Sequence, residues 1–282
     1  MKLWAVLLFF VLLIGFNFSY LSNSGLLVFG LKNARQITFK NAHLHAEKGT
    51  PTLSSFRMEP FLTPEECSQI SKSVYKLKKQ WELRNVAMST LGTASYLDGP
   101  SKQKYVEKSL QSNPLIRQHF QPLLDKVQQY FQDKTTSKVV YKENAALPGF
   151  HVFDCNKIFS MPVASVHRDL QWQKLTFSKD EDIDMQNMLS FTLAIELPPG
   201  GGGLYTFEQN IPPIVTVLIP RGIVSSFAPK TKIEYKEGYM VTHNGQTDHM
   251  IAPCEMSVNK KRITLQGHGV YEKNNDTWYL YW

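Results

Sequence analysis

The hydrophobic and polar positions divide the chain into four parts. Residues 3–16 contain no polar residue, and residues 31–58 show no clear periodicity. Residues 64–81 and about 114–133 carry apolar positions at helical spacing. From residue 138 onward, short β-branched and aromatic runs are separated by Gly, Pro, Asn and Asp. The pattern predicts an apolar N-terminal segment, a linker, two helical regions and then a series of strands.

The first helix has a sharp predicted start. Thr63 can cap it, Pro64 suits its first position and Glu66 can complete a capping box. The apolar residues that follow at helical spacing are Ile70, Val74, Leu77 and Trp81. We therefore expect a helix from residue 64 that buries this face.

A second helical region is predicted at about residues 114–133, with a break or kink at Pro122. The strand-like runs that follow are 137–142, 149–155, 189–197, 203–207, 214–219, 238–243, 262–271 and 278–282. Helices followed by many short strands indicate an α+β, mainly β domain. The candidates are a sandwich, a jelly roll or a barrel, not a series of βαβ units.

The N-terminus predicts targeting outside the cytosol. Lys2 precedes an apolar run with the length of a signal-peptide core, and Phe18, Tyr20 and Leu21 could extend it towards a membrane span. We expect residues 1–30 to be a signal-anchor, with a cleaved signal peptide as the alternative. Residues 31–58 would then be a linker or stalk and 59–282 the domain. This predicts a single-pass membrane protein with its domain in the secretory lumen or periplasm, or else a secreted soluble form.

Composition and charge narrow the classes of partner. With 43% hydrophobic and 20% charged residues among 282, the chain has globular composition. Residues 1–145 hold 19 Lys+Arg against 10 Asp+Glu, but these cations are scattered and no nucleic-acid-binding motif accompanies them. No nucleic-acid partner is expected.

The three cysteines, Cys67, Cys155 and Cys254, lie too far apart for a zinc motif. They allow at most one disulfide, and the sequence leaves its pairing open.

A set of polar residues predicts metal chemistry. His167 and Asp169 are two residues apart, so on a strand both would project from one face. An HxD pair alone is a weak signal, but His249 follows, and then Arg262 and Thr264 share another strand face. Two histidines and a carboxylate form the facial triad of non-haem Fe(II) sites, and an arginine beside a hydroxyl suits capture of a carboxylate.

In this order the residues resemble those of the iron(II)- and 2-oxoglutarate-dependent oxygenases, and within them the prolyl 4-hydroxylase-like group. The resemblance covers residues 59–272. Its specific parts are the HxD and the later His and Arg. Its supporting parts are the helix entry at 59–67, the strand at 191–197 with the Gly-Gly step at 202–207, and Gly238, Pro253 and 262–265. The resemblance implies a double-stranded β-helix (jelly-roll) core with N-terminal supporting helices.

The resemblance assigns His167, Asp169 and His249 to iron. His243 and His268 are rival third ligands, more in keeping with a supporting or structural role.

For 2-oxoglutarate, the resemblance assigns Arg262 to the distal carboxylate with help from Thr264. The gap from His249 to Arg262 is longer than the family's usual spacing, which leaves Lys260 or Lys261 as alternatives. The polar residue on the strand before the HxD would be Tyr141 or His151.

The resemblance implies a dioxygenase that uses Fe(II), 2-oxoglutarate and O2, with ascorbate as an optional further cofactor, and that hydroxylates an unactivated C–H bond and releases succinate and CO2. A protein or peptide side chain is the first expected substrate. A small molecule, lipid or glycan is the second. The competing class is a catalytically inactive jelly-roll binding module.

Overall fold

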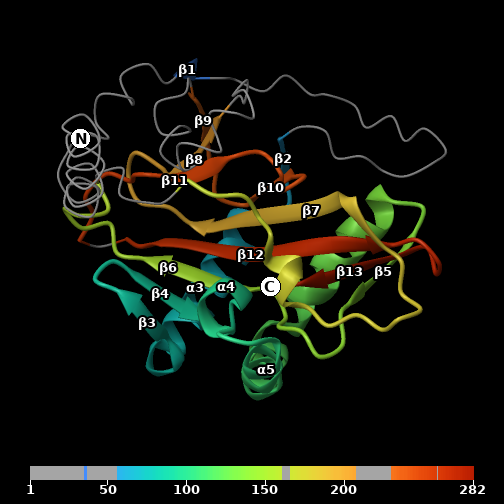
Figure 1. Ribbon diagram of the computed structural model, residues 1–282. Coiled ribbons are helices and arrows are strands. Elements are labelled where there is room, and N and C mark those ends of the chain that lie inside the picture. Colours follow the sequence, from blue (N-terminus) through green and yellow to red (C-terminus); the bar gives the residue numbers. More distant parts are fainter. Residues whose placement is uncertain (1–34, 37–55, 161–165, 208–229, 259) are drawn as a thin grey trace, which may run out of the picture.

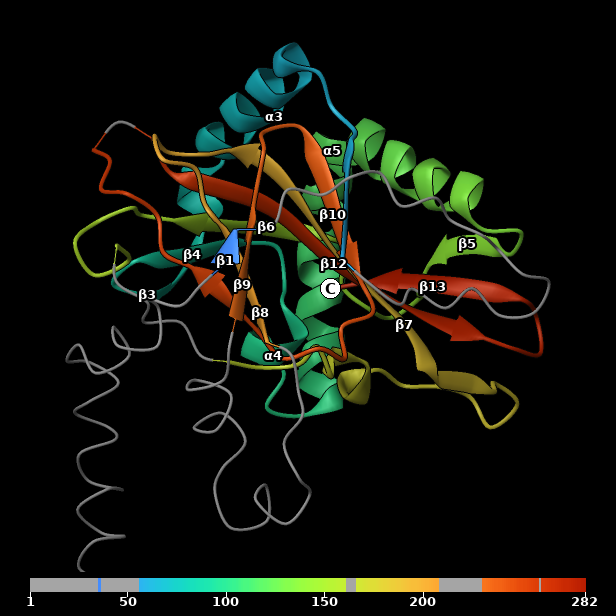
Figure 2. The same cartoon turned by 90° about the horizontal axis from the view of Figure 1, so that it is seen from above.

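The computed structural model describes residues 35–36, 56–160, 166–207, 230–258 and 260–282. Figures 1 and 2 show three layers: a large central sheet, helices α3 and α5 on one side of it, and a small sheet on the other. The large sheet has nine strands, with the order β2-β10-β7-β12-β6-β4-β3, while β13 pairs with β12 and β5 pairs with β13. The small sheet has the order β1-β9-β8-β11. Two facing, mainly antiparallel sheets with few helices fit the expected jelly-roll core.

The elements have the following bounds. The helices are α3 (Pro64–Lys76), α4 (Ser95–Asp98) and α5 (Lys102–Lys134), with 3-10 turns η1 (Lys78–Gln80) and η2 (Gln171–Lys174). The large sheet holds β2 (Arg57–Pro60), β3 (Glu82–Asn85), β4 (Met88–Leu91), β5 (Lys138–Tyr141), β6 (Gly149–Phe153), β7 (Ile183–Glu196), β10 (Tyr239–His243), β12 (Arg262–Glu272) and β13 (Thr277–Tyr281). The small sheet holds β1 (Arg35–Gln36), β8 (Gly203–Phe207), β9 (Lys230–Glu234) and β11 (His249–Ala252).

The predicted helix start at residue 64 is confirmed. The Thr63 hydroxyl accepts the N–H of Glu66 over 3.2 Å, and the Glu66 carboxylate accepts the N–H of Thr63 over 2.8 Å. These two bonds complete the capping box. Val74 is fully buried and Ile70 packs on the same core, so the predicted face is the one that α3 presents to the large sheet.

Helix α5 begins twelve residues before the predicted start. Ser101 caps it by accepting the N–H of Lys104, and its first turns bury only Tyr105 and Ser109, which is too sparse a pattern to be recognised in the sequence. The predicted kink is confirmed: Phe120, two residues before Pro122, leaves helical geometry with φ −133° and ψ 16°. The missing N–H of the proline explains this break.

Every predicted strand run within the described ranges is a strand, and the run at 214–219 lies outside them. The sequence pattern missed β1, β2, β3, β4, β9 and β11. Strand β3 reads ELRN and is mostly exposed at the end of the large sheet, so it lacks the apolar alternation that marks a strand.

Near the N-terminus, the expected anchor at 1–30 lies outside the described residues. Residues 57–58, assigned to the linker from the sequence, are the first half of β2, which pairs with β10. Within the described ranges, no helix is both long and apolar enough to span a membrane.

Strand alternation decides which residues face the interior between the two sheets. On β12, Ile263 and Leu265 belong to the apolar core shared with the helices, while Arg262, Gln266 and His268 line a cavity on the opposite face. On β7 the polar residues Ser190 and Thr192 line the same cavity. A period of two residues thus places an apolar core on one side of the sheet and polar groups on the other.

Candidate metal and cosubstrate site

A cavity of about 680 Å³ contains the candidate functional residues. His167, Asp169, His249 and Arg262 all line it, as do both rival histidines, His243 and His268. This volume lies within the range typical of small-molecule and cofactor sites. Residues separated by nearly a hundred positions in the sequence therefore meet in one chamber.

His167 and Asp169 do not lie on a regular strand, which corrects the expected placement of the HxD. Instead, His167 forms a single antiparallel bridge with His249 in which each N–H donates to the other carbonyl over 2.9 Å. This pairing puts two of the candidate ligands directly opposite each other. Asp169 is fixed separately, because its N–H donates to the carbonyl of Gly245 over 2.8 Å.

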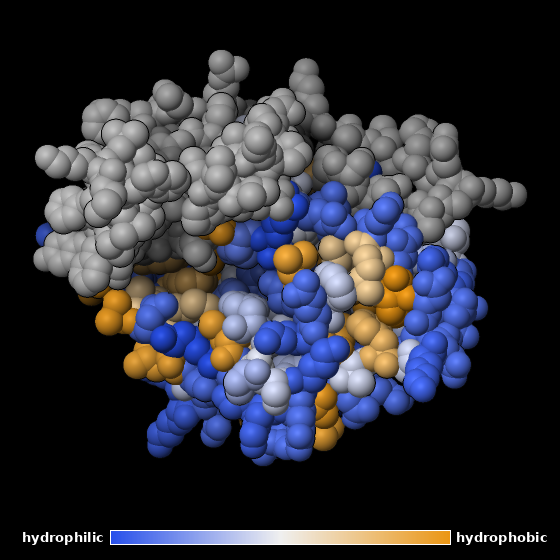
Figure 3. Space-filling view, viewed as in Figure 1, coloured by the Kyte–Doolittle hydropathy of each residue, from blue (hydrophilic) through white to orange (hydrophobic). Residues whose placement is uncertain are grey.

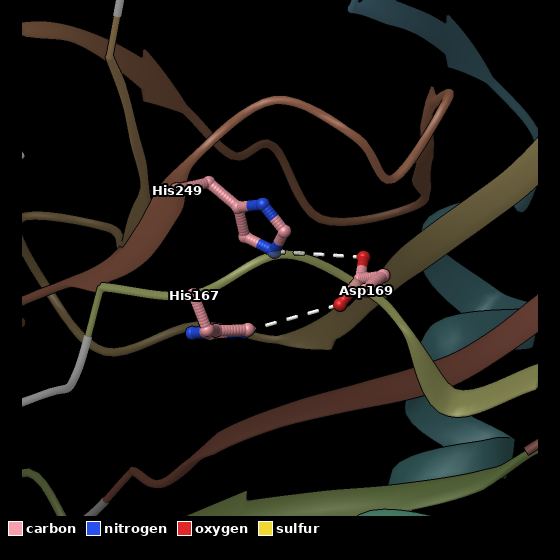
Figure 4. Close-up of side chains that lie close together, drawn as sticks. All are labelled: His167, Asp169 and His249. Carbon is pink, nitrogen blue, oxygen red and sulfur yellow. Dashed lines mark ion pairs between the residues drawn. The ribbon is translucent and has the colours of Figure 1, made fainter. Parts of the chain in front are cut away.

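The three candidate metal ligands converge (Figure 4). The Nε2 atom of His167 lies 3.9 Å from Asp169 Oδ1, and Nε2 of His249 lies 3.5 Å from Asp169 Oδ2. One ligand atom from each residue falls within 4.8 Å of the others. Ligand atoms about 2.1 Å from one ion at right angles lie about 3 Å apart, so a small closure of the side chains brings all three onto one ion.

Electrostatics favour a cation at Asp169. Burial alone raises the pKa of this carboxyl group, but the charge and hydrogen bond of His249, with His268 and His243 nearby, bring its pKa well below the usual range. The same carboxylate overcomes the effect of burial on His249 and raises the pKa of that imidazole. Asp169 thus stays ionised and holds a proton on His249 that a divalent cation can replace.

The hydrogen-bond partners set the tautomer of each histidine. Nδ1 of His249 donates to the carbonyl of Thr247 over 2.8 Å, which leaves Nε2 for a metal. Nδ1 of His243 instead accepts the N–H of Gly245 over 3.0 Å, so its remaining hydrogen sits on Nε2 and points towards Asp169, 3.7 Å away. His243 is therefore a neighbour of the triad that lacks a free ligand atom.

The other rival ligand, His268, lies outside the set of converging ligand atoms. Its Nδ1 lies 3.0 Å from the hydroxyl of Ser190 on β7, and its side chain is buried. On the opposite side of the triad, the amide Nε2 of Gln171 donates to Asp169 Oδ1 over 3.1 Å. Gln171 thus orients the carboxylate, and it is a residue that no sequence motif identified.

Arg262 is fully buried and has no carboxylate partner in the part of the chain that the structure describes. Its Nη1 and Nη2 donate to the carbonyls of Ala252 and Gly203 over 3.1 and 3.0 Å, and its Nε has no partner among the described groups. The guanidinium also lies against the rings of Phe153 and Tyr235. Burial lowers its pKa, which is the electrostatic cost of a desolvated cation without an anion.

The two lysines proposed as alternatives to Arg262 are paired elsewhere. Lys261 contacts Asp154, and Lys260 lies 3.6 Å from Glu237. Neither lines the cavity. Of these three candidates, only Arg262 is placed to meet an anion inside the cavity.

The remaining residues predicted to bind the cosubstrate are His151, Thr264 and Tyr141, and they differ in their distance from the cavity. His151 lines the cavity and is the register partner of Thr264, a buried residue whose hydroxyl accepts from Gln266 over 3.0 Å. Tyr141 does not reach the cavity. It lies on β5, and its hydroxyl donates to a carbonyl of α5, that of Leu124, over 2.7 Å.

Tyr96 is a second cavity residue that the sequence did not indicate. Its hydroxyl hydrogen-bonds Nε2 of His151, and burial raises its pKa while lowering that of His151 to about 3. It is carried by α4, which a two-bond ion pair between Arg84 and Asp98 holds in place at 2.8 and 2.6 Å. A four-residue helix has no periodicity that could have revealed this role.

Comparison with protein-family models and with curated sequences finds no match. The chain is similar to several solved structures. One is an N-substituted L-amino acid dioxygenase in complex with α-ketoglutarate from Burkholderia ambifaria, with 13% identity over 63% of this chain and 68% of that chain and a TM-score of 0.40. Another is HygX from Streptomyces hygroscopicus with nickel and 2-oxoglutarate bound, with 11% identity, 77% and 83% coverage and a TM-score of 0.42.

A third similar structure is a prolyl-4-hydroxylase from Pseudomonas putida, with 14% identity, 75% and 89% coverage and a TM-score of 0.32.

Proposed function

We propose that this protein is an Fe(II)- and 2-oxoglutarate-dependent dioxygenase that hydroxylates an unactivated C–H bond, most simply on a protein side chain. The observation that carries the proposal is the joint presence, in one cavity, of a two-histidine, one-carboxylate cluster and a buried arginine without an anionic partner among the described residues. The first suits Fe(II) and the second suits the distal carboxylate of 2-oxoglutarate.

The residues fit an iron ion. His167 and His249 would supply imidazole nitrogens and Asp169 one oxygen, with the other ligand positions left for the cosubstrate and O2. The carbonyl of Thr247 orients His249, and the side chain of Gln171 orients Asp169, each through a hydrogen bond. When bound, Fe(II), 2-oxoglutarate and O2 would supply the oxidising chemistry and yield the hydroxylated product, succinate and CO2.

The residues also fit the cosubstrate. The Nε of Arg262 is an orphaned donor, and burial makes its interaction with a carboxylate stronger than it would be in water. Thr264 lies two residues along the same strand, and the neutral His151 and the phenol of Tyr96 border the same chamber. The chain thus contributes binding, orientation and exclusion of water around the reacting groups.

A protein substrate outside the cytosol is part of the proposal. The apolar N-terminal segment predicts a signal-anchor with the domain in a secretory lumen or periplasm. The disulfide between Cys155 and Cys254 supports an oxidising compartment. Carbonate extraction and protease protection of the full chain test this placement, and a soluble cytosolic product would contradict it.

The experiment for the activity uses the full-length chain in detergent. Fe(II) binding and 2-oxoglutarate-dependent succinate release are measured for the wild type, for His249→Ala and for His243→Ala as the matched control. We expect loss of both signals in the first variant and retention in the second. A wild type that binds neither iron nor 2-oxoglutarate would favour the alternative, a catalytically inactive jelly-roll binding module.

A further inference from the structure

Four exposed apolar side chains surround the mouth of the cavity. They are Val86, Leu97, Ile158 and Leu170, called the apolar rim below, and their exposed fractions are 70%, 40%, 43% and 44%. They come from four separate segments: the turn between β3 and β4, helix α4, the loop after β6, and the residue that follows Asp169. Apolar residues gather over β3, β4 and the neighbouring loops in Figure 3.

The rim contrasts with the rest of the cavity. Asp169, His249 and Arg262 are buried, whereas the side chain of His167 is 40% exposed. The other two cations that line the cavity, Arg168 and Lys174, are already engaged. Arg168 pairs with Asp248 over 2.7 Å, and Lys174 donates to the carbonyl of Gly99 over 3.0 Å. An apolar group therefore meets a rim whose neighbouring cations, Arg168 and Lys174, both have hydrogen-bond partners.

The rim is held rigidly. The side chain of Asn156 donates to the carbonyl of Val86 over 3.2 Å and accepts the N–H of Ile158 over 3.0 Å, so one residue fixes two rim segments to each other. Its neighbour Cys155 is tied by a disulfide to Cys254. A preorganised apolar surface loses little conformational entropy when something binds to it.

The exposure of the rim indicates a substrate that extends beyond the cavity. A small molecule enclosed in a pocket leaves the outer side chains in water, because such ligands bury most of their own surface within the cavity. A polypeptide whose target residue enters the cavity lies across the mouth and covers Val86 and its neighbours with its flanking residues. Contiguous exposed apolar residues that converge from separate segments mark such interaction sites.

We propose that the substrate is a protein segment with apolar side chains flanking the oxidised residue, and that the apolar rim selects it. This inference rests on the proposed dioxygenase function and assigns the substrate class of the same site. Ile158 and Val86 would contact the flanking side chains, since they are exposed and held by the same asparagine. They would determine specificity without touching the reacting atoms.

The test uses the full-length enzyme with Fe(II) and 2-oxoglutarate. Each synthetic peptide carries a central Pro, Lys or Asn. Its flanks are apolar (Leu and Val), polar (Ser and Gln), acidic (Glu) or basic (Lys). Binding of each peptide is measured by fluorescence anisotropy in the absence of O2. Products are then detected by the gain of one oxygen atom in the peptide. We expect apolar flanks to bind about tenfold or more tightly than polar ones, since each apolar side chain buried at the rim contributes on that order.

Variants then connect the preference to the rim. Val86→Asp and Ile158→Asp should weaken binding of the apolar-flanked peptides about tenfold and shift the preference towards Lys-flanked peptides. Leu83→Asp is the matched control, because Leu83 is 73% exposed on the same hairpin but does not line the cavity. A shift in preference cannot arise from unfolding, which would reduce binding of all peptides.

The outcomes separate the two proposals. A wild type that neither binds iron nor releases succinate would overturn the proposed function. Three outcomes with intact succinate release would overturn the rim inference alone. They are equal binding of all peptide classes, a preference for polar flanks, and oxidation of free apolar small molecules in place of peptides.

Discussion

His249 and His243 lie with their rings 4.8 Å apart and both approach Asp169, yet their Nδ1 atoms make opposite hydrogen bonds. The Nδ1 of His249 donates to a carbonyl, so Nε2 can bind a metal. The Nδ1 of His243 accepts a backbone N–H, so Nε2 carries the hydrogen. Two residues of the same type in one chamber are thereby distinguished by the backbone beneath them.

The first prediction separates these histidines by metal affinity. Ala at His167, Asp169 or His249 should weaken Fe(II) binding more than a hundredfold, because each removes a ligand. His243→Ala should weaken it by about tenfold, the lower end of the effect that follows the loss of a residue outside the ligand set. Isothermal titration under anaerobic conditions measures the Fe(II) affinity of each variant. A larger effect at His243 than at His249 would show that His243 is the third ligand.

The second prediction concerns the cosubstrate. Arg262→Lys keeps the charge but loses the planar fork, so the KM for 2-oxoglutarate should rise more than kcat falls. Arg262→Leu should cost about 2 to 5 kcal/mol of binding, because a buried carboxylate would lose its partner. Succinate release as a function of 2-oxoglutarate concentration measures these constants. An unchanged KM together with a lower melting temperature would make Arg262 a purely structural residue.

The third prediction concerns pH. Burial lowers the pKa of His151 to about 3 in the folded state, below the value of 6.5 expected when unfolded. The unfolded chain therefore binds a proton first as the pH falls, so this contribution to stability is complete above pH 6.5 and is lost progressively towards pH 3. At pH 5 the loss is about 2 kcal/mol.

His151→Gln removes this titration while keeping an acceptor for the hydroxyl of Tyr96. The difference in unfolding free energy between pH 7 and pH 5, measured by urea denaturation, should be smaller in the variant than in the wild type by about 2 kcal/mol. Groups common to both proteins, including His249 with its raised pKa, cancel in this comparison. Equal differences would show that His151 titrates normally in the folded protein.

The fourth prediction concerns the disulfide. Cys155 and Cys254 are 99 positions apart, and their link limits the freedom of the unfolded chain. Replacing both by Ala should lower the free energy of unfolding by about 2 to 4 kcal/mol and make it insensitive to reductant. Cys67→Ala is the control, since this buried thiol is free and its variant should respond to reductant as the wild type does. A wild type with the same stability in oxidising and reducing buffer would contradict the pairing.

The sequence by itself determined the features that depend on local chemistry. The capping box at Thr63 and Glu66, the kink near Pro122 and the strand runs from residue 138 follow from groups within a few residues of each other, which is why they could be predicted. The order of His167, Asp169, His249 and Arg262 indicated the enzyme class because the family places these residues in that order.

The tertiary structure alone decided what depends on neighbours distant in the sequence. Cys155 pairs with Cys254, 99 positions further along the chain. Arg262 is buried against the carbonyls of Ala252 and Gly203 and meets no anion among the described residues. Tyr96 and Gln171 carry no motif, and they reach the cavity only because α4 and η2 pack against its wall. Contacts of this kind between distant segments arise only in the assembled sheets, so no periodicity in the chain encodes them.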